Sequence, residues 1–172
     1  MGNEVHDDGD AALKSHLHRA FDGQIPNYGS YNLVYAAGRA GAGGAFVVGF
    51  RRQPMEIVVA PLHPRTLAAL EPAVAINLTN LSHLAEVRAG GHEVGTSTGR
   101  VFRFGVDGTP SVDAPAAVST AAGGRVRLDQ ARDALDFRDF MDEFMTMLDG
   151  FDGGGPGSAG DGEPSGDGQR RG

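Results

Sequence analysis

The spacing of hydrophobic residues predicts a helix near each end of the chain. In residues 11–21, Leu13, Leu17 and Phe21 recur every four positions and therefore share one helical face. Asp10 is a suitable N-terminal cap for this helix, and Gly23 is a suitable end. Residues 128–149 predict a longer amphipathic helix with acidic residues on its other face. Its apolar stripe consists of Ala131, Leu135, Phe137, Phe140, Met141, Phe144, Met145 and Leu148.

Between these helices, the hydrophobic period changes to that of β-strands. Two runs rich in β-branched residues, 45–52 and 55–62, are separated only by Gln53-Pro54, which indicates an antiparallel hairpin. A second hairpin is indicated at 92–106, with its turn at Thr98-Gly99. We also predict strands at 31–35, 73–81 and 84–88, a short helical piece at 65–71 and a loop at 107–124.

This order of elements predicts a mainly β fold of the α+β class. We expect a small antiparallel barrel or bent sheet of six to seven strands, with the C-terminal helix capping its core. A strand-rich body with such a closing helix resembles the pleckstrin-homology-like barrel from about Gly29 to Leu148. The resemblance implies a partly closed barrel plugged at one end by the helix. It also implies a role in binding phosphate head groups, peptides or partner proteins, although function does not follow from fold.

The two ends of the chain differ in composition from the part between them. Residues 153–172 are almost entirely Gly, Asp, Pro, Ser and Arg, with too little apolar surface to offset the entropy of ordering them. We therefore expect a disordered tail there and a loose start at 1–9. The 172-residue chain would then contain one domain, 10–152.

Charge and cysteine content narrow the classes of function. A net charge of −7 disfavours binding to nucleic acid or to anionic membranes. The chain has no cysteine, which excludes disulfides and thiolate chemistry. No apolar run approaches the roughly 20 residues of a membrane span, and the acidic first residues do not form a secretory signal. We therefore expect a cytoplasmic protein.

A glycine-rich segment, Gly38 to Gly44, follows the predicted strand at 31–35 and has the composition of a phosphate-binding loop. Such loops need a helix after them, because the helix N-terminus supplies the anion site. Here 45–52 has adjacent valines, two phenylalanines and Gly49, which are poor helix formers. The segment therefore predicts a hairpin loop, and a nucleotide-handling enzyme using it stays an alternative.

Neither a metal site nor a catalytic site is apparent in the sequence. The six histidines form no HExxH motif, so a zinc site would have to be assembled across the fold from His63, His83 and His92. The carboxylates of the strand region are scattered, and no serine occupies a GxSxG elbow. We predict no catalytic residue, no cofactor and no metal.

Arginines are the candidate ligand-binding residues, because guanidinium groups bind phosphate and carboxylate in a bidentate manner. If the barrel forms, several could converge on one surface; otherwise they are solvated. The candidates are Arg51, Arg52, Arg88, Arg100 and Arg103.

The C-terminal helix is a second candidate surface. Its Phe and Met residues suit core packing, but Met147 and Phe151 fall off the main stripe and suit a homodimer contact.

These observations favour a non-enzymatic cytoplasmic binding or protein-interaction domain for an unidentified protein or small ligand. The alternatives are the nucleotide-handling enzyme and a reader of phosphate or lipid head groups that uses the arginines. A helix after Gly44 would favour the enzyme, whereas a hairpin there would favour the binding module. A concave cluster of arginines would favour the head-group reader.

Overall fold

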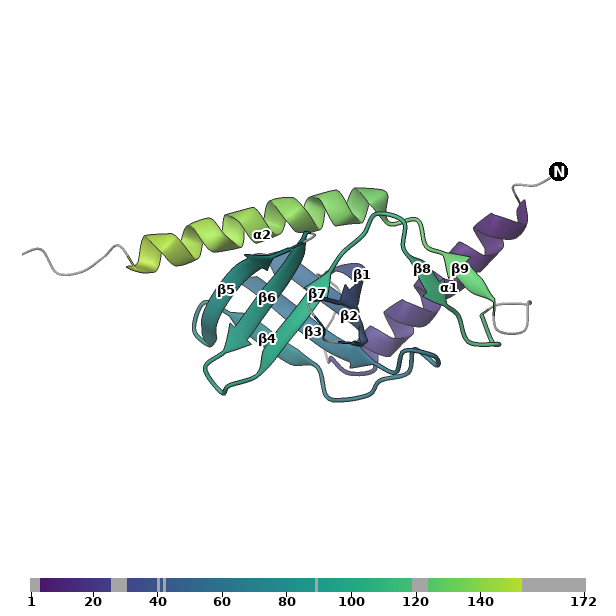
Figure 1. The fold of residues 1–172 in the computed structure, drawn as a ribbon, viewed down its shortest axis with the longest axis horizontal. Helices are drawn as coiled ribbons and strands as arrows, with labels where there is room; N and C mark the ends of the chain where they lie inside the picture. The colour runs from purple at the N-terminus through teal and green to yellow at the C-terminus, as the bar shows by residue number, and fades with distance from the viewer. Residues whose placement is uncertain are drawn as a thin grey trace, which may run out of the picture.

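The computed structural model describes residues 4–25, 31–39, 41, 43–88, 90–118 and 124–152. Within these residues, two helices flank a series of strands (Figure 1). In chain order the elements are α1 (Glu4–Asp22), β1 (Asn32–Gly38), β2 (Ala45–Arg52), β3 (Met55–Leu62), β4 (Val74–Asn77), β5 (Leu81–Val87), β6 (Gly91–Thr96), β7 (Val101–Gly105), β8 (Ser111–Asp113), β9 (Arg125–Arg127) and α2 (Ala131–Asp152). The tail at 153–172, predicted to be disordered, lies outside the described residues.

Seven strands form one antiparallel sheet that curls into a nearly closed barrel. Their order is β4–β3–β2–β1–β7–β6–β5. β1 joins the two halves of the sheet, because it pairs with β2 along Asn32 to Ala37 and with β7 through Ala37 and Gly38 only. The predicted α+β fold, with a helix-capped antiparallel barrel, is confirmed.

The C-terminal helix covers one face of the sheet (Figure 1). Phe137, Phe140 and Phe144 of α2 are fully buried, and the ring of Phe50 in β2 lies 5.3 Å from that of Phe137 and 5.2 Å from that of Phe140. The prediction was wrong at the start of the stripe, because Ala131 and Leu135 are exposed. Leu135 lies about 160° around the helix from Phe137, so both cannot face the core.

The N-terminal helix covers the other face of β2 and β3. Its predicted stripe, Leu13, Leu17 and Phe21, is buried in a second core with residues such as Val47 and Leu62. Gly49 permits this packing, since a Cβ atom there would lie 2.2 Å from Cζ of Phe21. Both faces of β2 and β3 are therefore covered, which explains their nearly continuous hydrophobic runs.

The first helix starts earlier than predicted. α1 begins at Glu4, so Asp10 lies inside the helix and is not its N-terminal cap. The Asp10 carboxylate instead pairs with Lys14 at 2.7 Å and accepts a hydrogen bond from the backbone of Asp129 at 2.8 Å. Asp10 therefore links α1 to the segment that precedes α2.

Three predictions about the connecting segments were also wrong. Residues 65–71 form a turn rather than a helical piece, and Leu67 has a positive φ of 53°. The strand predicted at 73–81 ends at Asn77, because the side chain of Asn80 accepts a hydrogen bond from its backbone N–H and stabilises a turn. The predicted loop at 107–124 contains β8, which pairs with β9.

Candidate binding cleft beside the C-terminal helix

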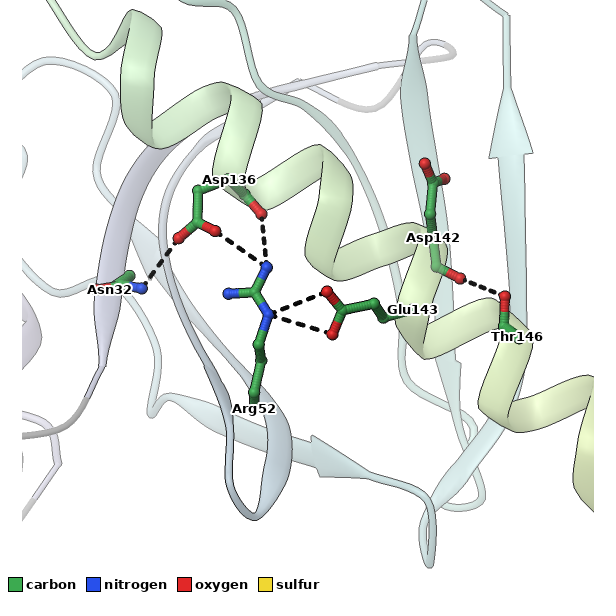
Figure 2. Close-up of polar contacts among 6 residues, drawn as sticks. All are labelled: Asn32, Arg52, Asp136, Asp142, Glu143 and Thr146. Atoms are coloured by element: carbon green, nitrogen blue, oxygen red, sulfur yellow. Dashed lines mark hydrogen bonds and ion pairs between the residues drawn. The ribbon is translucent and has the colours of Figure 1, made fainter.

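One flank of α2 is fastened to the sheet by a single arginine. Nε of Arg52, at the end of β2, donates to both carboxylate oxygens of Glu143 at 3.1 Å, and its terminal nitrogen pairs with Asp136 at 3.0 Å. Asp136 also accepts a hydrogen bond from Asn32 of β1 at 3.1 Å (Figure 2). The hydrogen bond with Asp136 is the main cause that raises the pKa of Arg52. This network fixes the helix against β1 and β2.

The start of α2 is fixed by Gln130, whose role the sequence did not indicate. Its buried side-chain amide donates to the carbonyls of Tyr35 at 2.9 Å and Asp107 at 2.7 Å, and its oxygen accepts from the backbone of Tyr35 at 2.8 Å. These hydrogen bonds therefore fix the orientation of α2 at its start, relative to β1 and to the segment after β7.

The opposite flank of α2 leaves a cleft of about 300 Å³ against the strands β5 and β6. Its lining combines apolar and charged side chains from the two sides. The residues that define it are Glu86, His92, Phe137, Arg138, Asp142 and Met145. The cleft therefore combines apolar side chains with a few polar and charged groups, a combination that ligand sites use for contact area and orientation.

His92 lies at the base of the cleft and is only 9% exposed. Its ring centroid lies 5.7 Å from that of Phe137 and 6.4 Å from that of Phe104. Burial lowers the pKa of His92 below its ordinary value of 6.5, while Glu86 and Asp142 act in the opposite direction. Its Nδ1 atom is buried and has no hydrogen-bond partner among the described residues. The cleft therefore contains a neutral imidazole with unused hydrogen-bonding capacity.

Three charged side chains line the cleft. Glu86, Arg138 and the carboxylate of Asp142 make no ion pair with another residue in the described part of the chain. They face a shared space beside His92, and each acts on its pKa. The cleft is thus a place where charges remain available to a ligand.

The predicted arginine sites are engaged by separate carboxylates. Arg51 pairs with Glu56 at 2.9 Å and lies 4.6 Å from the ring of Tyr31, while Arg52 holds α2 as described. Tyr31 also donates to Glu56, and burial raises the pKa of Tyr31 to about 12. The structure therefore uses these two neighbouring arginines for different internal contacts.

The remaining predicted arginines lie on the other half of the barrel. Arg100 pairs with Glu71 at 2.6 Å, and Arg103 pairs with Glu93. Arg88 lies exposed in the turn after β5. The four paired arginines each have a carboxylate partner of their own, and no two of them share one.

The glycine-rich segment forms the connection of the β1–β2 hairpin. The N–H of Gly38 donates to the carbonyl of Gly44 at 3.0 Å, and β2 begins at the next residue. A strand therefore follows this loop, in place of the helix N-terminus that a phosphate site would use.

The three histidines considered for zinc lie in different settings. Nδ1 of His63 accepts from backbone N–H groups of its own turn, and His83 pairs with Glu93 at 2.9 Å. Arg103, and secondarily His83, lower the pKa of Glu93. Across the described residues, no three His, Asp or Glu side chains could hold a metal ion together.

Comparison of the chain with protein-family models, curated proteins and solved structures gives no match. No helix in the described ranges is long and apolar enough to cross a membrane. The geometry of the cleft and its surroundings is therefore the basis for a functional proposal.

Proposed function

We propose that this domain is a non-enzymatic protein-interaction module that binds an extended segment of a partner along β5, beneath the end of α2. The strand order and closing helix are compatible with the pleckstrin-homology-like barrel that the sequence resembles, and such domains include peptide and protein binders. The proposal itself rests on three features of β5, α2 and the cleft.

The first feature is the free edge of β5. In the sheet described here, β5 pairs with β6 on one side and ends the strand order. An edge strand presents unpaired N–H and C=O groups, to which an extended peptide can add as a further strand. β4 forms the other edge but has only four residues, compared with seven in β5. The longer edge offers more backbone hydrogen bonds to a partner.

The second feature, on which the proposal mainly depends, is that the apolar stripe of α2 continues beyond β5, the edge strand of the sheet. Figure 1 shows the C-terminal end of α2 extending beyond β5. The sequence pattern predicted that Phe151 falls off the main stripe, but Phe151 lies two turns after the buried Phe144 and only about 20° away around the helix, so it continues the stripe. It is nevertheless 72% exposed. Met147 is 46% exposed. A strand added to β5 would lie about 4.8 Å from it. It would be on the side where the C-terminal end of α2 extends beyond the sheet.

The third feature is the cleft, which adjoins this edge because Glu86 belongs to both. It offers a pocket for a side chain of the added strand, as strand-addition sites use pockets for specificity.

The alternatives have less support. The hairpin after Gly38 lacks the helix that a nucleotide site would use, and the four paired arginines are neutralised by separate acids.

Selection from a random-peptide phage library tests the proposal. We expect the wild-type domain to enrich peptides that shift the amide NMR signals of β5. The double variant Met147→Ser/Phe151→Ser should lose this enrichment with an unchanged melting temperature. Leu135→Ser is the matched control, because Leu135 is 60% exposed on the same helix but lies near its other end.

Two results would overturn the proposal. One is a wild-type domain that enriches no peptide, or whose peptides bind the double variant and the control equally well. The other is a wild-type dimer that the double variant converts to a monomer, since a second copy of the chain would then be the occupant of this surface.

A further inference from the structure

We infer that the cleft beside α2 receives one cationic side chain, an arginine or a lysine, of the bound segment. This inference rests on the proposed function, which supplies the segment. Three features of the cleft support a cationic guest: its charges, the state of His92 and the position of Glu86 at the edge of the sheet.

The charges of the cleft favour a cation. Two carboxylates, Glu86 and Asp142, and one guanidinium, Arg138, line it, so their formal charges sum to −1. None of the three is neutralised by an ion pair with another described residue. A guest cation would bring the sum to zero and gain charge-assisted hydrogen bonds, whereas an anion would raise the excess negative charge.

His92 and its neighbours suit the rest of such a side chain. Because the imidazole is buried between Phe104 and Phe137, it stays neutral near pH 7 and does not repel a cation. The ring of Phe137 and the thioether of Met145 also line the cleft. Arginine and lysine place their aliphatic stems on apolar surface of this kind while the charged group contacts polar atoms.

The register of the sheet positions the cation. Glu86 of β5 is paired with His92 of β6, which is paired in turn with Phe104 of β7, so the three residues form one row across the sheet. A strand added to β5 would continue this row with a residue opposite Glu86. Directly opposite side chains on antiparallel strands have Cβ atoms about 5 Å apart, and opposite charges at such positions attract.

Small cationic and anionic probes test the pocket directly. N-acetylarginine methylamide should shift the ring signals of His92 and the methyl signal of Met145 saturably in NMR titrations. N-acetylglutamate methylamide should not. Glu86→Gln and Asp142→Asn should each weaken the arginine probe by about tenfold, because each removes one charged acceptor. Asp139→Asn is the control, since Asp139 is an exposed acid of α2 outside the cleft.

The inference fails if the glutamate probe binds more tightly than the arginine probe, or if Asp139→Asn weakens binding as much as Glu86→Gln. Failure of the inference can be distinguished from failure of the proposed function. Phage peptides that bind along β5 but lack an arginine or lysine at a fixed position would overturn the cation pocket and leave the binding function intact. Saturable, Glu86-dependent binding of the arginine probe without any selected peptide would support the pocket and overturn strand addition.

Discussion

At the scale of single residues, burial controls the chemistry of His92. Its pKa is lowered in the folded state, so the unfolded chain binds a proton at a higher pH than the folded chain does. His92 therefore destabilises the fold as the pH falls below about 6.5 towards its folded pKa, and has no such effect above that range. Glu86 and Asp142 lessen the effect, whereas Arg138 adds to it.

The variant His92→Phe removes this titration and leaves an aromatic ring between Phe104 and Phe137. Urea denaturation at pH 7.5 and pH 5 should show a smaller loss of unfolding free energy for the variant than for the wild type. The difference between the two proteins isolates the effect of position 92, because the rest of the chain is the same in both. Parallel losses in the two proteins would show that His92 is protonated as easily in the fold as in the unfolded chain.

Residue types alone could not locate the cleft. The sequence indicated the arginines because guanidinium groups are common ligands, yet the fold uses Arg52 to hold α2. His92 and Glu86 were missed as a pair because their proximity depends on the register of β5 against β6. That register includes an irregularity between Leu81 and His83, so simple alternation along β5 does not say which side chains face the helix.

At the scale of elements, α2 closes the core, and its buried phenylalanines should dominate its contribution to stability. Phe144 is fully buried, and its ring lies 5.6 Å from that of Phe140. Phe144→Ala should lower the unfolding free energy by about 3–5 kcal/mol, because it removes a large apolar side chain and leaves a cavity. Asp139→Ala, on the exposed side of the same helix, should change it by less than about 0.5 kcal/mol.

Urea denaturation with size-exclusion chromatography measures both variants. A Phe144→Ala protein as stable as the wild type, but altered in association, would mean that α2 is a partner-binding arm and not part of the core.

The elements were predictable where one period extends over several turns or strands. Leu13, Leu17 and Phe21 fix the face of α1 because the spacing of four is unbroken. Leu135 was wrongly predicted to face the core. The apolar residues in the first turn of α2 are compatible with a stripe on either side of the helix, and only packing against the sheet determines which side is buried. β8 was missed because three residues are too few to show a period.

At the scale of the whole molecule, the closure of the barrel depends on contacts that no local pattern encodes. The hairpins follow from short turns between strands that are neighbours in sequence. By contrast, β1 and β7 are far apart in sequence and pair through Ala37–Gly105 and Gly38–Phe104. The same closure places α2 over the sheet and leaves its last turns beyond β5 (Figure 1). The position of α2 over the closed barrel therefore causes both the packing of the core and the exposure of Phe151. The sequence predicts the helix and the barrel, but not this position.

This arrangement separates the residues that stabilise the fold from those proposed to bind a partner, and two truncations test the separation. A chain ending at Asp152 retains Phe151, whereas a chain ending at Asp149 loses it. Both keep the buried residues of α2, which end at Phe144, so both melting temperatures should lie within about 2 °C of the full chain. Only the longer one should bind a peptide selected by the wild type. Equal binding by both would remove Phe151 from the site, and a large drop in melting temperature of the shorter one would place the end of α2 in the folding core.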